Sequence, residues 1–159
     1  MRLPRLPRRL QALLALLPPA RSVADVGAGH GALALHLAAR HVARVIATEA
    51  APGPYQELRR NLDAWGATQM VEARLGNGLA PLERGEVEGV VAAGMGARSL
   101  LKICADAADR DVAWVALQCV QDPELIEPWR KRHGWQTLAS CPVHERGHQY
   151  LVWLLKVAR

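Results

Sequence analysis

A glycine-rich turn and two acidic residues are the part of the sequence best suited to chemistry. Asp25 lies in a short apolar run that leads into Gly27, Gly29 and Gly31, which is typical of a strand entering a tight turn. A helix after such a turn presents free N–H groups and the positive end of its dipole to a ligand. Twenty residues beyond Gly29 stands Glu49, where a carboxylate can accept hydrogen bonds from both ribose hydroxyls. The spacing predicts a site for an adenosine-containing cofactor.

Two kinds of cofactor fit this turn. Residues 27–32 read as G-x-G-x-x-A, which also describes a dinucleotide site, so a nicotinamide oxidoreductase is an alternative. Asp25 favours a cationic ammonium group over a pyrophosphate, and 159 residues leave no room for the substrate domain of most dehydrogenases. Both points favour S-adenosyl-L-methionine. The plainer alternative for Asp25 is that it only caps the following helix.

The remaining reactive residues predict little further chemistry. Methyl transfer from a sulfonium depends mainly on alignment of the reacting atoms, so it requires no nucleophile–base pair, and none is evident in the sequence. Cys141, His144 and His148 have the spacing C-x2-H-x3-H, but a fourth ligand is not evident, and we expect no metal site. The three cysteines form no disulfide framework, which favours reduced thiols in the cytoplasm.

Alternating strands and helices must position the glycine turn. Apolar strands that alternate with helices predict an α/β fold with a mostly parallel sheet and helices on both faces. The last two strands flank a turn at residues 145–148 and predict a C-terminal antiparallel hairpin. The expected strands are 23–26, 44–48, 70–74, 89–93, 114–118, 137–143 and 150–156, and the expected helices are 5–17, 30–41, 54–65, 98–108 and 123–133.

The positive charge is concentrated at the N-terminus. Residues 1–22 contain five arginines and no acid, whereas the other 15 basic residues are balanced by all 15 acidic residues. Because guanidinium groups bind phosphate, this basic segment suggests a polyanionic partner, and Arg5, Arg8 and Arg9 are the candidate RNA-binding residues. A solvated first helix is the alternative. No apolar run has the length of a membrane span, so we expect no membrane partner.

Seven short motifs lie in order along the whole chain. They are Arg9-Leu10, residues 23–27 (VADVG), Glu49 with Gly53-Pro54-Tyr55, residues 74–79 (RLGNGL), residues 93–96 (AGMG), Leu117-Gln118 and residues 145–150 (ERGHQY). Together they resemble the motifs of the bacterial tRNA (adenine-22-N1) methyltransferases. That family belongs to the class I S-adenosylmethionine-dependent methyltransferases.

This resemblance implies a fold, a cofactor and a set of site residues. The fold would be a Rossmann-like, seven-stranded methyltransferase domain over residues 1–159, with a basic N-terminal helix in 1–20 and the core in 21–159. The cofactor would be S-adenosyl-L-methionine and the substrate tRNA or another structured RNA. The implied cofactor-binding residues are Asp25, Gly27, Gly29, Glu49, Asn77 and Gly94, and the implied catalytic residues are His30 and Met95.

The chain also departs from the family pattern. Gly29 and Ala32 stand where the family has an acid and a tyrosine, and we expect no counterpart of the family's C-terminal helical extension. A carboxylate at position 29 could stabilise the cation that methylation of adenine N1 creates, and only His30 remains nearby. Two hypotheses follow: a tRNA adenine-N1 methyltransferase, or a catalytically weakened, cofactor-binding relative that acts as an RNA-binding or regulatory module.

Overall fold

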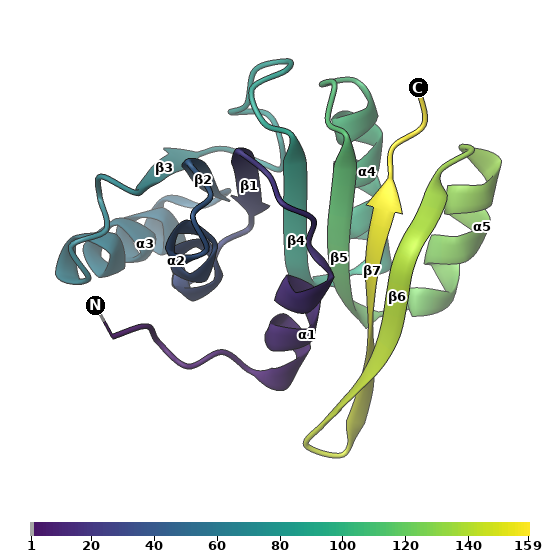
Figure 1. Cartoon of the computed structure of the whole chain (residues 1–159), viewed down its shortest axis with the longest axis horizontal. Coiled ribbons are helices and arrows are strands. Elements are labelled where there is room, and N and C mark those ends of the chain that lie inside the picture. The colour runs from purple at the N-terminus through teal and green to yellow at the C-terminus, as the bar shows by residue number, and fades with distance from the viewer. Residues whose placement is uncertain (1) are drawn as a thin grey trace.

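A seven-stranded sheet forms the centre of the protein, as the computed structural model of residues 2–159 shows (Figure 1). The strand order is β3-β2-β1-β4-β5-β7-β6; the first five strands run parallel, and β7 pairs antiparallel with both β5 and β6. The predicted fold class is therefore confirmed. The strands are β1 (Ser22–Val26), β2 (Arg44–Glu49), β3 (Val71–Leu75), β4 (Gly89–Gly96), β5 (Trp114–Gln121), β6 (Gln136–Glu145) and β7 (His148–Lys156).

Helices cover both faces of the sheet because its central strands are apolar on both sides. One buried cluster joins the sheet to α1 (Arg8–Leu16), α2 (Ala32–Ala39) and α3 (Pro52–Ala64). The other joins it to α4 (Ala97–Ala108) and α5 (Ile126–Arg132), which follows the short 3-10 helix η1 (Pro123–Leu125). Within residues 2–159, no helix combines the length and apolar character needed to cross a membrane.

The N-terminal helix is shorter than the sequence predicted. It begins at Arg8 rather than at residue 5, and Pro7 precedes it with an extended backbone (φ −58°, ψ 155°). A proline disfavours the helical conformation at the residue before it, so Leu6 cannot continue a helix into Pro7. The prediction for residues 5–7 was wrong, and Arg5 lies outside the helix.

The helix after the glycine turn also begins later than predicted. Gly31 stands at its N-cap with φ +91°, a left-handed conformation outside the helical region. A Cβ on Gly31 would lie 2.7 Å from Leu58 Cδ1, so α2 approaches α3 closely here. His30 consequently lies in the turn, not in the helix as predicted.

The fourth strand and the hairpin extend beyond their predicted ends. β4 continues through a bulge at Gly94 (φ +77°) to Gly96, and α4 follows without a loop. The hairpin turn consists of Arg146 and Gly147, both with positive φ, as in the tight turns that match strand twist. The last pair between β5 and β7 is Cys119 with Leu151, so the hairpin tip projects past the end of β5 (Figure 1).

Candidate functional site

The carboxyl ends of the parallel strands bring the predicted site residues to one edge of the sheet. The turn after β1 is tied to β2 by a hydrogen bond from Ala28 N to Thr48 O of 2.9 Å. The turn after β3 is tied to β2 in the same way, from Gly76 N to Glu49 O at 2.8 Å. This edge, beside the point where the chain order reverses between β1 and β4, is where open α/β sheets bind ligands.

A small pocket of about 150 Å³ contains the first predicted acid, Asp25, and we call it the Asp25 pocket. Asp25 is only 2% exposed, and its Oδ2 atom has no hydrogen-bond partner among residues 2–159. Burial, and secondarily the charge of Glu49, raises the pKa of Asp25 from 3.8 to about 7. The pocket is lined by Arg9, Leu10, Asp25, Gly27, Ala28, Gly29, His30, Ala32, Leu33, Ala93, Gly94 and Gln118.

A larger pocket of about 510 Å³, the Glu49 pocket, lies on the other side of the turn. Glu49 Oε1 accepts a hydrogen bond of 2.6 Å from Gly29 N, which fixes the carboxylate beside the glycine turn. The pocket mixes apolar, amide, hydroxyl and charged groups, as a nucleoside site does. It is lined by Val26, Gly27, Thr48, Glu49, Ala50, Gly76, Asn77, Gly78, Met95, Ser99, Lys102, Ile103 and Asp106.

Gly27 lies between the two pockets and lines both. Its φ is +69°, and a Cβ there would collide with Met95 Cε, so the methionine side chain lies against the glycine backbone. Met95 lines the Glu49 pocket, whereas its neighbour Gly94 lines the Asp25 pocket. The motif at residues 93–96 therefore contributes to both sides of the turn, and Met95 lies beside Glu49 and Asn77 rather than beside Asp25.

His30 lies at the rim of the Asp25 pocket, with its side chain 80% exposed. Its Nδ1 atom is 3.5 Å from Glu57 Oε1, and its carbonyl accepts a hydrogen bond of 3.0 Å from Asn61 Nδ2. Both partners belong to α3, so α3 orients this residue. The two departures from the family pattern, Gly29 and Ala32, line the same pocket.

The three predicted RNA-binding arginines have different environments. Arg5 and Arg8 are exposed, whereas Arg9 is half-buried. Arg9 Nη1 forms an ion pair of 2.6 Å with Glu145 Oε2, so its charge is already partnered. The three arginines share a groove of about 540 Å³, the arginine groove, which is lined by Arg5, Leu6, Pro7, Arg8, Arg9, Gln11, Glu145 and Arg146.

Sequence reasoning gave no role to several polar residues that line the two pockets. Gln118 is fully buried in β5; its Oε1 accepts from Gly94 N at 2.9 Å and its Nε2 donates to Cys119 O at 3.1 Å. Gln118 thereby holds the bulge of β4 at Gly94. The sequence feature that could have indicated this role is a polar amide within an otherwise apolar strand. Ser99, Lys102 and Asp106 of α4 reach the Glu49 pocket, and only the fold reveals their position.

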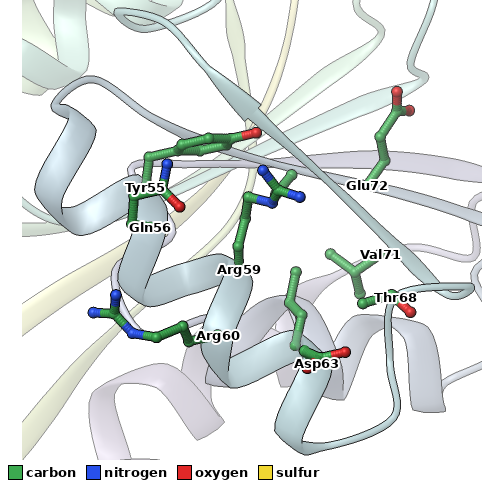
Figure 2. Close-up of a pocket in the computed structure, with 10 residues that line it drawn as sticks. Tyr55, Gln56, Arg59, Arg60, Asp63, Thr68, Val71 and Glu72 are labelled. Atoms are coloured by element: carbon green, nitrogen blue, oxygen red, sulfur yellow. The ribbon is translucent and has the colours of Figure 1, made fainter.

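A hollow of about 730 Å³ lies between α3 and β3 (Figure 2). Two arginines and two acids line it, so its charge is balanced. Figure 2 shows Arg59 directed toward the hollow and Arg60 directed away from it. The Arg59 guanidinium lies 5.8 Å from the centre of the Tyr55 ring. None of the predicted cofactor-binding, catalytic or RNA-binding residues lines this hollow.

The cysteines and histidines of residues 2–159 form no cluster suited to a metal ion. Cys104 and Cys119 are buried and Cys141 is half-buried, and all three thiols are free. Across residues 2–159, no group of three or more histidine, cysteine, aspartate or glutamate side chains is arranged to hold a metal ion.

Known proteins resemble this chain over most of its length. The chain is 29% identical over 153 residues to the tRNA (adenine(22)-N(1))-methyltransferase of Bacillus subtilis (strain 168), a match that covers 93% of this chain. The chain spans 63% of the length of that relative.

Solved structures share the fold of this chain. A Streptococcus pneumoniae protein in complex with S-adenosyl-L-methionine has a TM-score of 0.88 at 27% identity, covering 98% of this chain and 74% of that one. The TrmK protein of M. capricolum, in complex with S-adenosyl-homocysteine, shares the fold with a TM-score of 0.86 at 19% identity, covering 95% and 68%. The family described as "Methyltransferase domain" matches residues 6–153. The chain belongs to this family of methyltransferase domains.

Proposed function

We propose that the protein is an S-adenosyl-L-methionine-dependent RNA methyltransferase that acts on N1 of a tRNA adenine. One observation carries the proposal: Asp25 presents a buried, unpartnered carboxylate oxygen in a small pocket that adjoins the Glu49 pocket across Gly27. The matched relative is a tRNA methyltransferase, and a structural neighbour binds S-adenosyl-L-methionine.

The residues around Gly27 fit this cofactor. A buried carboxylate without a partner is costly, and an ammonium group would satisfy it. Asp25 would hold the methionyl ammonium, Glu49 the ribose hydroxyls, and Asn77 would lie beside the adenine. Gly29 and Gly94 leave open space, with nothing within 4 Å of an added Cβ, so a ligand can approach their backbone. When bound, the cofactor supplies an electrophilic methyl group on a sulfonium.

The protein's own residues would act mainly by positioning. Adenine N1 carries a lone pair, so no proton has to be removed before attack, and alignment supplies most of the acceleration. The target base has to leave its stack to reach a pocket of about 150 Å³. His30, oriented by Glu57, would take up the proton that the methylated base releases.

A second candidate function follows from Gly29 and Ala32, which replace the family's acid and tyrosine within the Asp25 pocket. The groups that would bind the cofactor are present in this chain. The carboxylate that could stabilise the cationic base is replaced by Gly29. A catalytically weakened module that binds the cofactor and RNA is the alternative. One methyltransferase domain over residues 1–159 and a cytoplasmic location remain predictions.

The deciding experiment is transfer of a labelled methyl group to unmodified tRNA, followed by nucleoside analysis, with Gly29→Asp run in parallel. Gly29 has φ +57°, which aspartate tolerates better than most residues, and the space around it is open, so the variant should fold. We expect N1-methyladenosine from the natural chain and more of it from Gly29→Asp. Product from Gly29→Asp alone would establish the weakened relative, and no product from either chain would contradict the proposal.

A further inference from the structure

The start of α1 meets the tip of the β6–β7 hairpin. Glu145 Oε2 pairs with the Arg9 guanidinium at 2.6 Å, and Glu145 Oε1 accepts a hydrogen bond of 3.0 Å from Arg8 N. The same guanidinium lies 5.6 Å from the centre of the Tyr150 ring, within the range of a cation–π contact. Arg9 is thus held from two sides by residues of the hairpin.

Arg9 also occupies a particular place: it lines both the arginine groove and the Asp25 pocket. The other basic residues of the groove, Arg5, Arg8 and Arg146, do not reach the Asp25 pocket. Arg9 therefore stands where the groove opens toward the proposed site of the target base.

The groove is a built feature of the fold. His36 Nε2 of α2 is 2.6 Å from Pro4 O, and Gln11 Nε2 donates to Leu6 O at 2.7 Å, so the extended N-terminal segment is anchored. On the other wall, the two-residue turn fixes Arg146 on the projecting hairpin tip. Both walls are therefore held by contacts within the protein.

The charge of the groove fits phosphate. Arg5, Arg8 and Arg146 are exposed, and none of them makes an ion pair with another residue of 2–159. The one acid that lines the groove, Glu145, is already paired with Arg9. Three free guanidinium groups along one hollow match the repeated charge of a nucleic-acid backbone.

We propose that the arginine groove, including Arg146 of the hairpin tip, binds the RNA backbone beside the target nucleotide, and that Glu145 is a positioning residue that fixes Arg9 at the mouth of the Asp25 pocket. This inference rests on the proposed function and adds the hairpin tip to the substrate site. Glu145 acts through Arg9 and touches neither the cofactor nor the reacting atoms.

Glu145→Gln tests the positioning role, because charge and position predict opposite outcomes. Loss of a negative charge from a basic groove strengthens or preserves RNA binding, whereas loss of the ion pair releases Arg9. We expect kcat for methyl transfer to fall about tenfold while the Kd for tRNA does not rise. Glu145→Asp keeps the carboxylate and should restore part of kcat. Glu127→Gln, which breaks a 2.7 Å pair with Arg130 in α5, is the matched control and should leave kcat unchanged.

Unchanged kcat in Glu145→Gln would overturn the positioning role. A parallel loss of thermal stability and of S-adenosyl-homocysteine affinity would also overturn it, since both indicate general unfolding around the hairpin. Absence of methyl transfer in the natural chain would contradict both the positioning role of Glu145 and the proposed function.

Arg146→Ala tests the groove without reference to catalysis. Loss of one phosphate contact should weaken tRNA binding and reduce the slope of log K against log salt by about 1. Arg132→Ala removes an exposed arginine at the end of α5. This residue shortly precedes the start of β6, at the other end of that strand from the hairpin tip, so the variant should leave the slope unchanged. Equal effects of the two variants, or no effect of Arg146→Ala, would show that RNA does not use the groove.

Discussion

Asp25 and Glu49 differ in what surrounds their carboxylates. Asp25 is buried with one oxygen unpartnered, whereas Glu49 is half-buried and accepts a hydrogen bond from Gly29 N. The first therefore pays a desolvation cost that a cation would relieve, and the second is already oriented by the turn. The sequence indicated both acids by spacing, but only the fold shows that they serve two adjoining pockets.

Burial of Asp25 predicts an unusual dependence of stability on pH. The raised pKa means that the folded state binds more protons than the unfolded state between pH 3.8 and about 7, so the free energy of unfolding falls as pH rises through this window. Asp25→Asn has no carboxyl group to ionise, so its free energy of unfolding does not fall in this way. Relative to the natural chain, the variant should gain up to about 4 kcal/mol between pH 4 and pH 7. Urea unfolding at a series of pH values measures the difference, and parallel profiles would contradict it.

Glu49→Ala should weaken binding of S-adenosyl-homocysteine. Removal of a charged acceptor of two hydroxyl hydrogen bonds costs about 2 kcal/mol, or roughly 30-fold in Kd. Glu124→Ala removes an exposed acid in η1 and is the calorimetric control. If both variants bind as the natural chain does, Glu49 does not hold the ribose.

At the scale of elements, the glycines of the turn between β1 and α2 have different roles. Gly31 combines a φ of +91° with close packing against Leu58, so it fixes both the start of α2 and its distance from α3. Gly29, by contrast, has open space around its α-carbon. The sequence could not separate these roles, since a glycine pattern shows where a turn lies but not what packs against it.

Gly31→Ala should destabilise the protein by about 1–3 kcal/mol, because a Cβ strains the backbone and presses on Leu58 Cδ1. Gly53→Ala, within α3 and with nothing within 4 Å of the new Cβ, should instead stabilise by about 0.5 kcal/mol. Chemical denaturation of the two variants measures both changes. A neutral Gly31→Ala would mean that α2 can shift away from α3 at little cost.

Strand positions were largely predictable, whereas helix ends and distant contacts were not. Apolar runs located the parallel strands, because such strands are buried on both faces, and the turn at residues 145–148 located the two strands of the hairpin. The predicted starts of α1 and α2 were wrong because backbone geometry prevailed at Pro7 and at Gly31. The Arg9–Glu145 pair joins residues 136 positions apart, and no local pattern indicates such a contact.

For the whole molecule, the fold separates a cofactor region from a charged region. The pockets around Gly27 lie at the carboxyl edge of the sheet, and the N-terminal segment and hairpin tip form the arginine groove beside it. The basic excess in residues 1–22 thus reaches the site only because α1 packs on β5, β6 and β7.

Combined Arg5→Ala and Arg8→Ala should lower the salt slope of tRNA binding by about 2, since each phosphate contact contributes about 0.9. Arg59→Ala with Arg60→Ala removes two exposed arginines of α3 outside the groove and is the matched control. Filter binding across a range of salt concentrations measures the slopes. Equal slopes for the two double variants would show that the N-terminal arginines form an ordinary solvated surface and do not bind RNA.

The central claim, that the turn around Gly27 serves a cofactor with an ammonium group, is tested most directly by calorimetric titration with S-adenosyl-homocysteine and with NADH. We predict that S-adenosyl-homocysteine binds more tightly, that its affinity increases as pH rises toward 7 because Asp25 must lose a proton, and that Asp25→Asn abolishes this pH dependence. Tighter binding of NADH would contradict the claim and favour a dinucleotide site.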